Sequence, residues 1–288
     1  MNVVVVVVLY NCLLSKSNTV QSLLAMPVNR TSKGFNVNVI IYDNGLDGPQ
    51  ELLLSHDHIQ YFASSVNEGM PAAYNYALKE AWETNAEWLL LLDQDTKLPA
   101  DYFKNLYEVV VPYATDSNVV AAVPKMHYQD VFFSPSKVLY AGIMRPIERV
   151  FSGIYPKELF AIASCSLLRV DFLREIGGFS EDYWLDCLDR WLYKKAHTLK
   201  RRVLVTDIIV EHELSVMNFD KFISEARYEN ILKYESKFMI NHCSFFENII
   251  FKLRLFVRSI KLYLDSDNKN FSLITVKHIF SPSNRKKS

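Results

Sequence analysis

Short apolar runs alternate with amphipathic runs through the first two-thirds of the chain. The apolar runs that predict strands lie at residues 3–9, 37–42, 59–62, 88–92, 119–123, 162–169 and 202–210. Apolar residues at helical spacing occupy the intervals 17–26, 70–84, 102–113, 171–176 and 185–198. Strands that alternate with helices are typical of βαβ units, so this pattern predicts an α/β domain with a mostly parallel central sheet flanked by helices.

The alternation is interrupted in the middle of the chain and ends in the last third. Residues 125–160 show no clear period, which predicts a mixed region with loops, and from about residue 216 the pattern becomes helical. We therefore expect one domain over residues 1–215 and a C-terminal helical region with a basic tail over residues 216–288.

Composition narrows the class of protein. Lys and Arg together number 32, as do Asp and Glu, and this balance argues against a general nucleic-acid binder. The four cysteines form no C-x-x-C pair, which favours a reducing cytoplasm over a disulfide framework or a zinc site. The apolar start of the chain lacks a positive leading region and a cleavage site, so we interpret it as a buried strand instead of a signal peptide.

Polar residues gather where the predicted strands end. They are Tyr10-Asn11, Asp43-Asn44-Gly45, Asn67-Glu68-Gly69 and Asp93-Gln94-Asp95, after the first four strands in turn. Ligands of an open parallel sheet bind beyond the carboxyl ends of its strands, so we expect these side chains to converge on one ligand.

Asp93 and Asp95 are the sharpest candidates for chemistry. Two carboxylates on a turn can hold Mg²⁺ or Mn²⁺, which prefer oxygen ligands. Asp is also common in ordinary turns, but the position directly after a buried apolar run favours the metal site. His212 follows a predicted strand and is a candidate third ligand, the alternative being a surface or core histidine.

A second pair of carboxylates, Asp186 and Asp189, is three residues apart and would share one face of the predicted helix 185–198. A transferase needs a base to take the proton from the attacking hydroxyl, and either carboxylate could serve. The alternative is structural, with Asp186 capping the helix and Asp189 in solvent.

Five motifs in this order resemble the family 2 glycosyltransferases of the GT-A fold, and within them the bacterial rhamnosyltransferases of surface-polysaccharide synthesis. They are the first strand with Tyr10-Asn11, the run Val39 to Gly45, the stretch Asn67 to Ala77, the run Leu90 to Thr96, and the segment Ser164 to Phe179. The resemblance implies an inverting, metal-dependent transferase. Its donor would be dTDP-rhamnose or a UDP-sugar, and its acceptor a growing polysaccharide or a lipid-linked oligosaccharide.

The resemblance also implies roles for single residues. Tyr10, Asn11 and Asp43 would hold the base and ribose, with Asn67 and Asn75 lining the same pocket. Asp93 would contact the ribose and sugar, and Asp95 the metal, with His212 completing the metal site. The base would be Asp186, with Asp189 close behind it.

Several positions depart from the family pattern. Leu46 replaces the usual Ser, Cys187 stands where many relatives carry an acid, and Trp191 stands where the subgroup often has Glu. These departures leave open a second function, a degenerate GT-A subunit that binds without catalysis in a polysaccharide-assembly complex.

The segment 243–264 alternates apolar residues with Lys252, Arg254, Arg258 and Lys261. A basic amphipathic helix is typical of a membrane-surface element, which would make the protein peripheral on the inner face of a membrane. The equal alternative is a helix packed on the catalytic domain with its cations in solvent.

Overall fold

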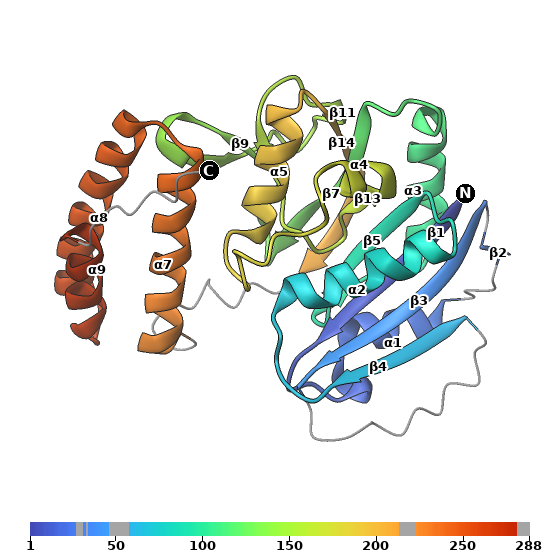
Figure 1. The fold of residues 1–288 in the computed structure, drawn as a ribbon, viewed down its shortest axis with the longest axis horizontal. Coiled ribbons are helices and arrows are strands. Elements are labelled where there is room, and N and C mark those ends of the chain that lie inside the picture. The colour runs from blue at the N-terminus through green and yellow to red at the C-terminus, as the bar shows by residue number, and fades with distance from the viewer. Residues whose placement is uncertain (27–30, 33, 46–57, 213–222, 281–288) are drawn as a thin grey trace. The chain divides into compact units, whose positions relative to one another are not determined.

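The computed structural model describes residues 1–26, 31–32, 34–45, 58–212 and 223–280 (Figure 1). The chain forms two compact units. The first comprises Met1–Lys137 and Pro146–Glu213, and the second comprises Val138–Arg145 and Leu214–Ser288. Position 46 and the basic tail at 284–288 lie outside the described residues.

The first unit is built on a sheet whose centre is β1 (Asn2–Leu9). On either side of it run β3 (Phe35–Asn44) and β5 (Trp88–Asp93), both parallel to β1, and β4 (Ile59–Ser64) is parallel to β3. Residues 3–9 are no more than 5% exposed, because helices cover both faces of this strand. The continuous apolar run that predicted this strand therefore reflects burial on both sides.

Beyond β5 the sheet continues through β13 (Leu167–Arg169), β7 (Val119–Tyr128) and β14 (Arg202–His212). β13 is antiparallel to both of its neighbours, whereas β7 and β14 are parallel. The predicted mostly parallel sheet is confirmed. The shorter strands are β2 (Thr31–Ser32), β6 (Thr96–Lys97), β8 (Val131–Ser134), β9 (Ser136–Val138), β10 (Met144–Pro146), β11 (Gly153–Ile154) and β12 (Leu159–Phe160).

Helices cover both faces of this sheet (Figure 1). The odd-numbered residues of β1 share one core with α1 (Asn18–Ala25) and α3 (Tyr102–Val110). The opposite face is covered by α2 (Met70–Glu83), which packs on β1 and β5 through a row of small residues. Three further helical segments are α4 (Val170–Glu175), α5 (Leu188–Thr198) and the short 3-10 turn η1 (Leu14–Lys16). Another 3-10 turn, η2 (Val111–Tyr113), extends α3.

Two predicted elements begin several residues later than predicted. The strand predicted at 162–169 is formed only at 167–169, because Cys165 has a left-handed φ of 61° and the Ser166 N–H donates to the Ala163 carbonyl oxygen in a turn. The helix predicted at 185–198 begins at Leu188. The chain before it turns away from helix geometry at Cys187, whose φ is 65°.

The late start of α5 has a tertiary cause. The Trp184 carbonyl oxygen accepts a hydrogen bond of 2.9 Å from the N–H of Met70, the first residue of α2. That carbonyl therefore satisfies one of the orphan donors of another helix end. As a result Asp186 precedes the helix and does not share a helical face with Asp189, contrary to the prediction.

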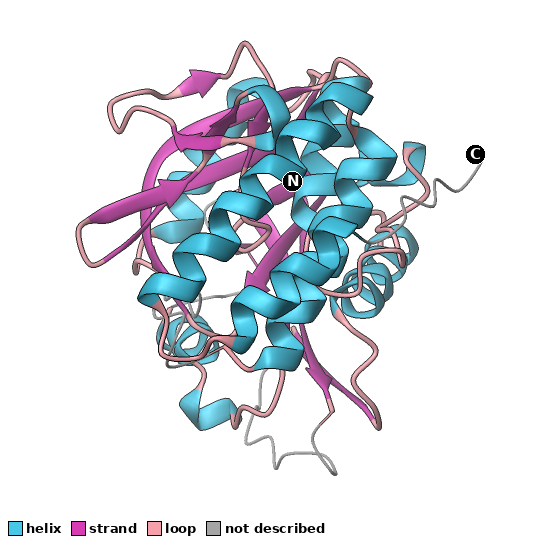
Figure 2. Cartoon of the chain, turned by 90° about the vertical axis from the view of Figure 1, so that its left-hand side faces the viewer, coloured by secondary structure: helices cyan, strands magenta, loops and turns pink. Residues whose placement is uncertain are grey.

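The second unit contains α7 (Glu225–His242), α8 (Phe245–Asp265) and α9 (Asn270–Phe280), which lie side by side (Figure 1, Figure 2). Ser244 and Glu247 form a capping box at the start of α8. The short turn η3 (Tyr140–Gly142) packs on this helix. There the Ala141 N–H donates to Glu247 Oε1 at 3.3 Å, and the Ala141 carbonyl accepts from Arg254 at 3.0 Å.

Candidate active site

The carboxyl ends of the central parallel strands bring the predicted donor residues to one edge of the sheet. The strand register pairs Leu9 with Asp43 and Val8 with Asp93, so the two carboxylates flank the end of β1. Tyr10 and Asn11 follow directly, and the main-chain N–H of Tyr10 donates to the side chain of Gln94 at 2.8 Å. The sequence predicts this convergence, because ligands of a parallel sheet bind beyond the carboxyl ends of its strands.

Asp43 is fully buried, and its Oδ2 accepts a hydrogen bond of 2.6 Å from the Tyr61 hydroxyl. A buried carboxylate requires such partners, because loss of hydration is costly. Tyr61 lies on β4, the neighbouring strand, and was not among the predicted site residues.

Asp93, Asp95 and His212 come together as a possible metal-binding cluster. One ligand atom from each lies within 4.8 Å of the others, and Nδ1 of His212 is 3.6 Å from Oδ1 of Asp95. His212 reaches the cluster because β6 and β14 pair antiparallel, with His212 opposite Thr96.

Hydroxyl groups of neighbouring segments form hydrogen bonds with His212 and with the main chain of Asp93. The Thr96 hydroxyl lies 3.0 Å from both Nδ1 of His212 and Oγ of Ser164, and the main-chain N–H of Asp93 donates to the same Ser164 oxygen at 3.0 Å. The Thr96 N–H in turn donates to the Thr19 hydroxyl at 3.0 Å. Such partners fix the orientation of metal-binding side chains. Thr19 lies in none of the five motifs, and the motif that begins at Ser164 does not predict this contact, since both residues act through tertiary contacts.

The electrostatics of the cluster suit a cation. Burial raises the pKa of Asp93 to about 6, with His212 opposing the rise and Asp95 adding to it. Burial also raises the pKa of Asp95, against an opposing effect of His212. One carboxylate oxygen of each aspartate is buried and accepts no hydrogen bond of ordinary length from the described part of the chain, although the Tyr74 hydroxyl lies near enough to Asp93 to oppose the rise of its pKa. Two buried anionic oxygens beside an imidazole fit a divalent cation such as Mg²⁺ or Mn²⁺.

The carboxylate of Asp189 lies near enough to Asp93 of this cluster for their charges to interact. It lies in the first turn of α5, where its Oδ1 accepts a 2.7 Å hydrogen bond from the Arg190 N–H. Burial raises the pKa of Asp189 to about 7, opposed by the Arg190 N–H and reinforced by the charges of Asp93 and Asp186. Asp186 itself is partly buried on the turn before the helix. A carboxyl poised near neutrality is suited to accept a proton.

Asn67 and Asn75, which were predicted to line the nucleotide pocket, make internal hydrogen bonds. The Asn67 side chain accepts from the Gly69 N–H at 3.0 Å, in the turn that leads into α2. The Asn75 amide bonds the main chain of Phe179 twice, at 2.9 and 2.8 Å. The Asn75 contacts tie α2 to the segment before α5, and the part of both asparagines in nucleotide binding stays a prediction.

Gly69 allows a close approach between α2 and the turn before α5. Its φ is 84°, and a Cβ at this position would lie 2.5 Å from the Trp184 side chain and main-chain oxygen. Glycine is therefore required here both for backbone conformation and for space. The approach fixes the turn that carries Asp186.

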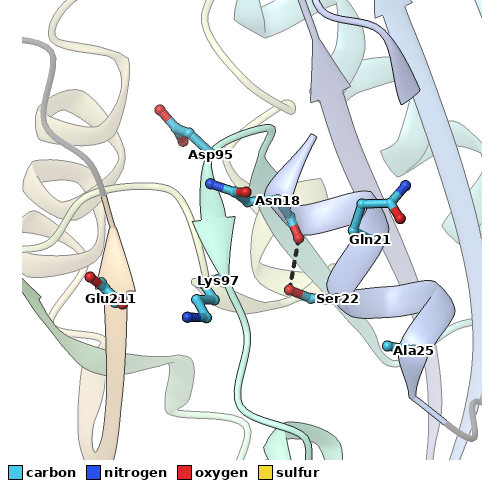
Figure 3. Close-up of a pocket in the computed structure, with 7 residues that line it drawn as sticks. All are labelled: Asn18, Gln21, Ser22, Ala25, Asp95, Lys97 and Glu211. Atoms are coloured by element: carbon cyan, nitrogen blue, oxygen red, sulfur yellow. Dashed lines mark hydrogen bonds between the residues drawn. The ribbon is translucent and has the colours of Figure 1, made fainter. Parts of the chain in front are cut away.

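A pocket of about 500 Å³ adjoins the cluster (Figure 3). It lies between α1 on one side and β6 and β14 on the other, and Asp95 is at one end. It is lined by Asn18, Gln21, Ser22, Ala25, Asp95, Lys97 and Glu211. Amide, hydroxyl and charged groups of both signs line it, so it suits a polar, hydroxylated ligand better than an apolar one.

Residues 4–177 match the family described as glycosyl transferase family 2. The matched span covers more than half of the chain, which therefore belongs to this family. This confirms the family that the sequence motifs indicated. No curated protein matches the chain.

Solved structures of TarS from S. aureus share the fold. The crystal structure of TarS aligns with a TM-score of 0.56 and 16% identity over 95% of this chain and 45% of that chain. TarS 1–349 aligns with a TM-score of 0.55 and 15% identity over 97% of this chain and 81% of that chain. Its complex with UDP-GlcNAc gives 0.52 and 18% over 95% and 76%.

The present chain thus spans less than half of the first TarS chain it matches. At these identities the likeness shows the fold, which is GT-A as predicted. The rhamnosyltransferase subgroup stays a prediction.

Proposed function

We propose that this glycosyltransferase moves a hexosyl group from a nucleoside-diphosphate donor to an acceptor hydroxyl, with inversion at the anomeric carbon and with help from a divalent metal. The observation that carries the proposal is the cluster of Asp93, Asp95 and His212 at the carboxyl edge of the sheet. Two of its carboxylate oxygens are buried and accept no hydrogen bond of ordinary length from the described residues, and a bound cation would compensate them.

Asp95 and His212, with Asp93 beside them, would hold Mn²⁺ or Mg²⁺. Such an ion supplies charge neutralisation for a departing diphosphate. Because this removes the need for a protein acid on the leaving group, a single working base is enough.

Tyr10, Asn11 and Asp43 would bind the nucleobase and ribose, since they meet at the end of β1 next to Asp93. The donor would be a UDP-sugar or dTDP-rhamnose. The structure of TarS 1–349 in complex with UDP-GlcNAc supports a UDP-sugar for a chain with this fold.

Asp189 is the better candidate for the base, with Asp186 as the alternative. Asp189 lies close enough to Asp93 for the two charges to interact, and its pKa of about 7 suits proton transfer near neutral pH. The proton of the acceptor hydroxyl would pass to its carboxylate as the oxygen attacks the anomeric carbon and the bond to the diphosphate breaks.

The acceptor would be a growing surface polysaccharide or a lipid-linked oligosaccharide, handled in the cytoplasm. In that setting the enzyme works next to the inner face of a membrane.

Thermal-shift binding of nucleoside diphosphates, with and without Mn²⁺, tests the donor site. We expect UDP or dTDP to raise the melting temperature in a Mn²⁺-dependent way, because a ligand that binds only the native state stabilises it. Asp95→Ala should abolish the Mn²⁺ dependence. If no nucleotide shifts the melting temperature, the non-catalytic binding subunit becomes the better interpretation.

A further inference from the structure

The helix α8 carries a continuous apolar stripe that the described residues of its own unit leave exposed. Nine large apolar side chains form it, and each is between 41% and 69% exposed. They are Phe245, Phe246, Ile249, Leu253, Phe256, Val257, Ile260, Tyr263 and Leu264. At about 100° per residue they fall within an arc of roughly 120°, so they form one face, here called the α8 stripe.

The opposite face of α8 already has its packing partners within the second unit. Phe251, Leu255 and Ser259 are buried, and the Ser259 carbonyl accepts a hydrogen bond of 2.8 Å from Ser272 of α9. Arg258 pairs with Glu235 of α7 at 3.0 Å. These contacts fix the rotation of α8 in its unit, so the exposure of the α8 stripe follows from the packing of the other face.

Two lysines border the α8 stripe. On the same helical projection Lys252 lies just beyond one edge and Lys261 just beyond the other, and residues 248–264 include no Asp or Glu. Lysine side chains beside an apolar face can lay their methylene stems along it and place the ammonium groups at its border. This is the charge arrangement that complements an anionic, apolar-cored surface.

Two kinds of occupant can be compared, a lipid bilayer and a second copy of the chain. No described helix is long and apolar enough to cross a membrane, so α8 would lie along a bilayer surface. A second copy of the chain would bring lysine-bordered stripes together, with no acid between 248 and 264 to pair with Lys252 or Lys261. An anionic bilayer satisfies both features, because acyl chains take the apolar face and lipid phosphates pair with the lysines.

We propose that α8 seats this protein on an anionic lipid bilayer, with the α8 stripe buried at the boundary between headgroups and acyl chains and with Lys252 and Lys261 against lipid phosphates. The proposal goes beyond sugar transfer. Its test uses no substrate, so its outcome is independent of the transferase assays.

Flotation of the full chain with vesicles tests it. Vesicles of phosphatidylcholine and phosphatidylglycerol in equal amounts should carry the protein upward, whereas phosphatidylcholine alone should carry much less. Raised salt should weaken the binding, because it screens the lysine–phosphate attraction. Leu253→Glu combined with Phe256→Glu should reduce the bound fraction at least about tenfold, since each change removes a large apolar side chain from the interface.

Matched variants separate the α8 stripe from general effects of charge. Val131→Glu combined with Val150→Glu makes the same change at two exposed valines of the first unit, and this variant should bind like the parent. Lys252→Glu combined with Lys261→Glu should remove the preference for anionic vesicles. Circular dichroism should show the parent helix content in every variant, because all the positions changed are at least partly exposed.

Failure of the parent protein to float with anionic vesicles would overturn the proposal. So would equal flotation of the stripe variant. Sedimentation analysis covers the second occupant: a dimer that the stripe variant converts to monomer, without vesicle binding, would make the α8 stripe an interface between copies. Undiminished anionic preference in the lysine variant would contradict the assigned role of the two lysines.

Discussion

Asp189→Asn should inactivate the enzyme and at the same time make the folded protein more stable at alkaline pH. Asn keeps the oxygen that accepts the Arg190 N–H, but it cannot ionise or take a proton. Loss of a general base typically costs ~10²–10⁴ in rate. The stability gain follows because the folded protein holds a carboxylate whose pKa is raised by burial and by the charges of Asp93 and Asp186.

The pKa shift of Asp189 sets the size of the stability gain expected for Asp189→Asn. A rise from 3.8 to about 7 corresponds to about 4 kcal/mol against the ionised form. Asp189 is only partly buried, so solvent screens part of this and we expect a gain of about 1–3 kcal/mol.

The size of the stability gain depends on pH. Below the unfolded pKa the carboxyl is protonated in both states and costs nothing. As pH rises toward 7 the unfolded chain ionises first, so the parent protein loses stability, and above 7 the full cost remains. The stability gain of Asp189→Asn should therefore be near zero at about pH 4 and complete at about pH 8.

Urea unfolding of the metal-free protein at both pH values measures the gain, and a transferase assay measures turnover. Turnover of the parent should rise with pH through about 7 as Asp189 ionises. Asp130→Asn, at an exposed turn, is the control and should stay within about 0.5 kcal/mol of the parent. A stability gain that is the same at both pH values, or a loss at pH 8, would refute the electrostatic explanation. Full turnover of Asp189→Asn would move the base to Asp186.

Three further outcomes follow from the site. Asp95→Ala should lower turnover by more than ~10²–10³, the usual cost of losing electrostatic help, and retained activity in EDTA would contradict the metal site. His212→Ala should weaken Mn²⁺ affinity by about 10-fold or more, as isothermal titration would show, and unchanged affinity would remove His212 from the ligand set. Gly69→Ala should destabilise the protein by about 2–4 kcal/mol, combining a clash with Trp184 and left-handed strain. Gly153→Ala is its matched control, with φ of 121° and open space, and should cost only the strain; equal losses in urea unfolding would disprove the clash.

The parts of the fold that sequence pattern predicted are those decided by burial. The first strand reads as unbroken valine because both of its faces are covered, and its paired neighbours Asp43 and Asp93 could be expected at one edge once the strand order was assumed. Asp95 and His212 also come together, although the two-residue strand that pairs them carries no pattern of its own.

The parts that could not be predicted depend on contacts between distant segments. Helical spacing at 185–198 does not reveal that the Trp184 carbonyl is bonded to Met70, which delays the helix and separates Asp186 from Asp189. Likewise, Ser164 reads as an ordinary strand residue, and its hydroxyl supports Asp93 only because the two segments meet in the fold.

The contacts of Ala141 have a consequence for the order in which the chain is completed during synthesis. Ala141 bonds to Glu247 and Arg254, which follow it by 106 and 113 residues. When the ribosome has finished the residues that form β14, Glu247 and Arg254 have not yet been made. The two hydrogen bonds of Ala141 to these residues form only after α8 has left the ribosome. Until then this turn is an exposed segment in a nascent chain whose central sheet can already be assembled, and a stalled or prematurely ended chain would be open to cleavage there.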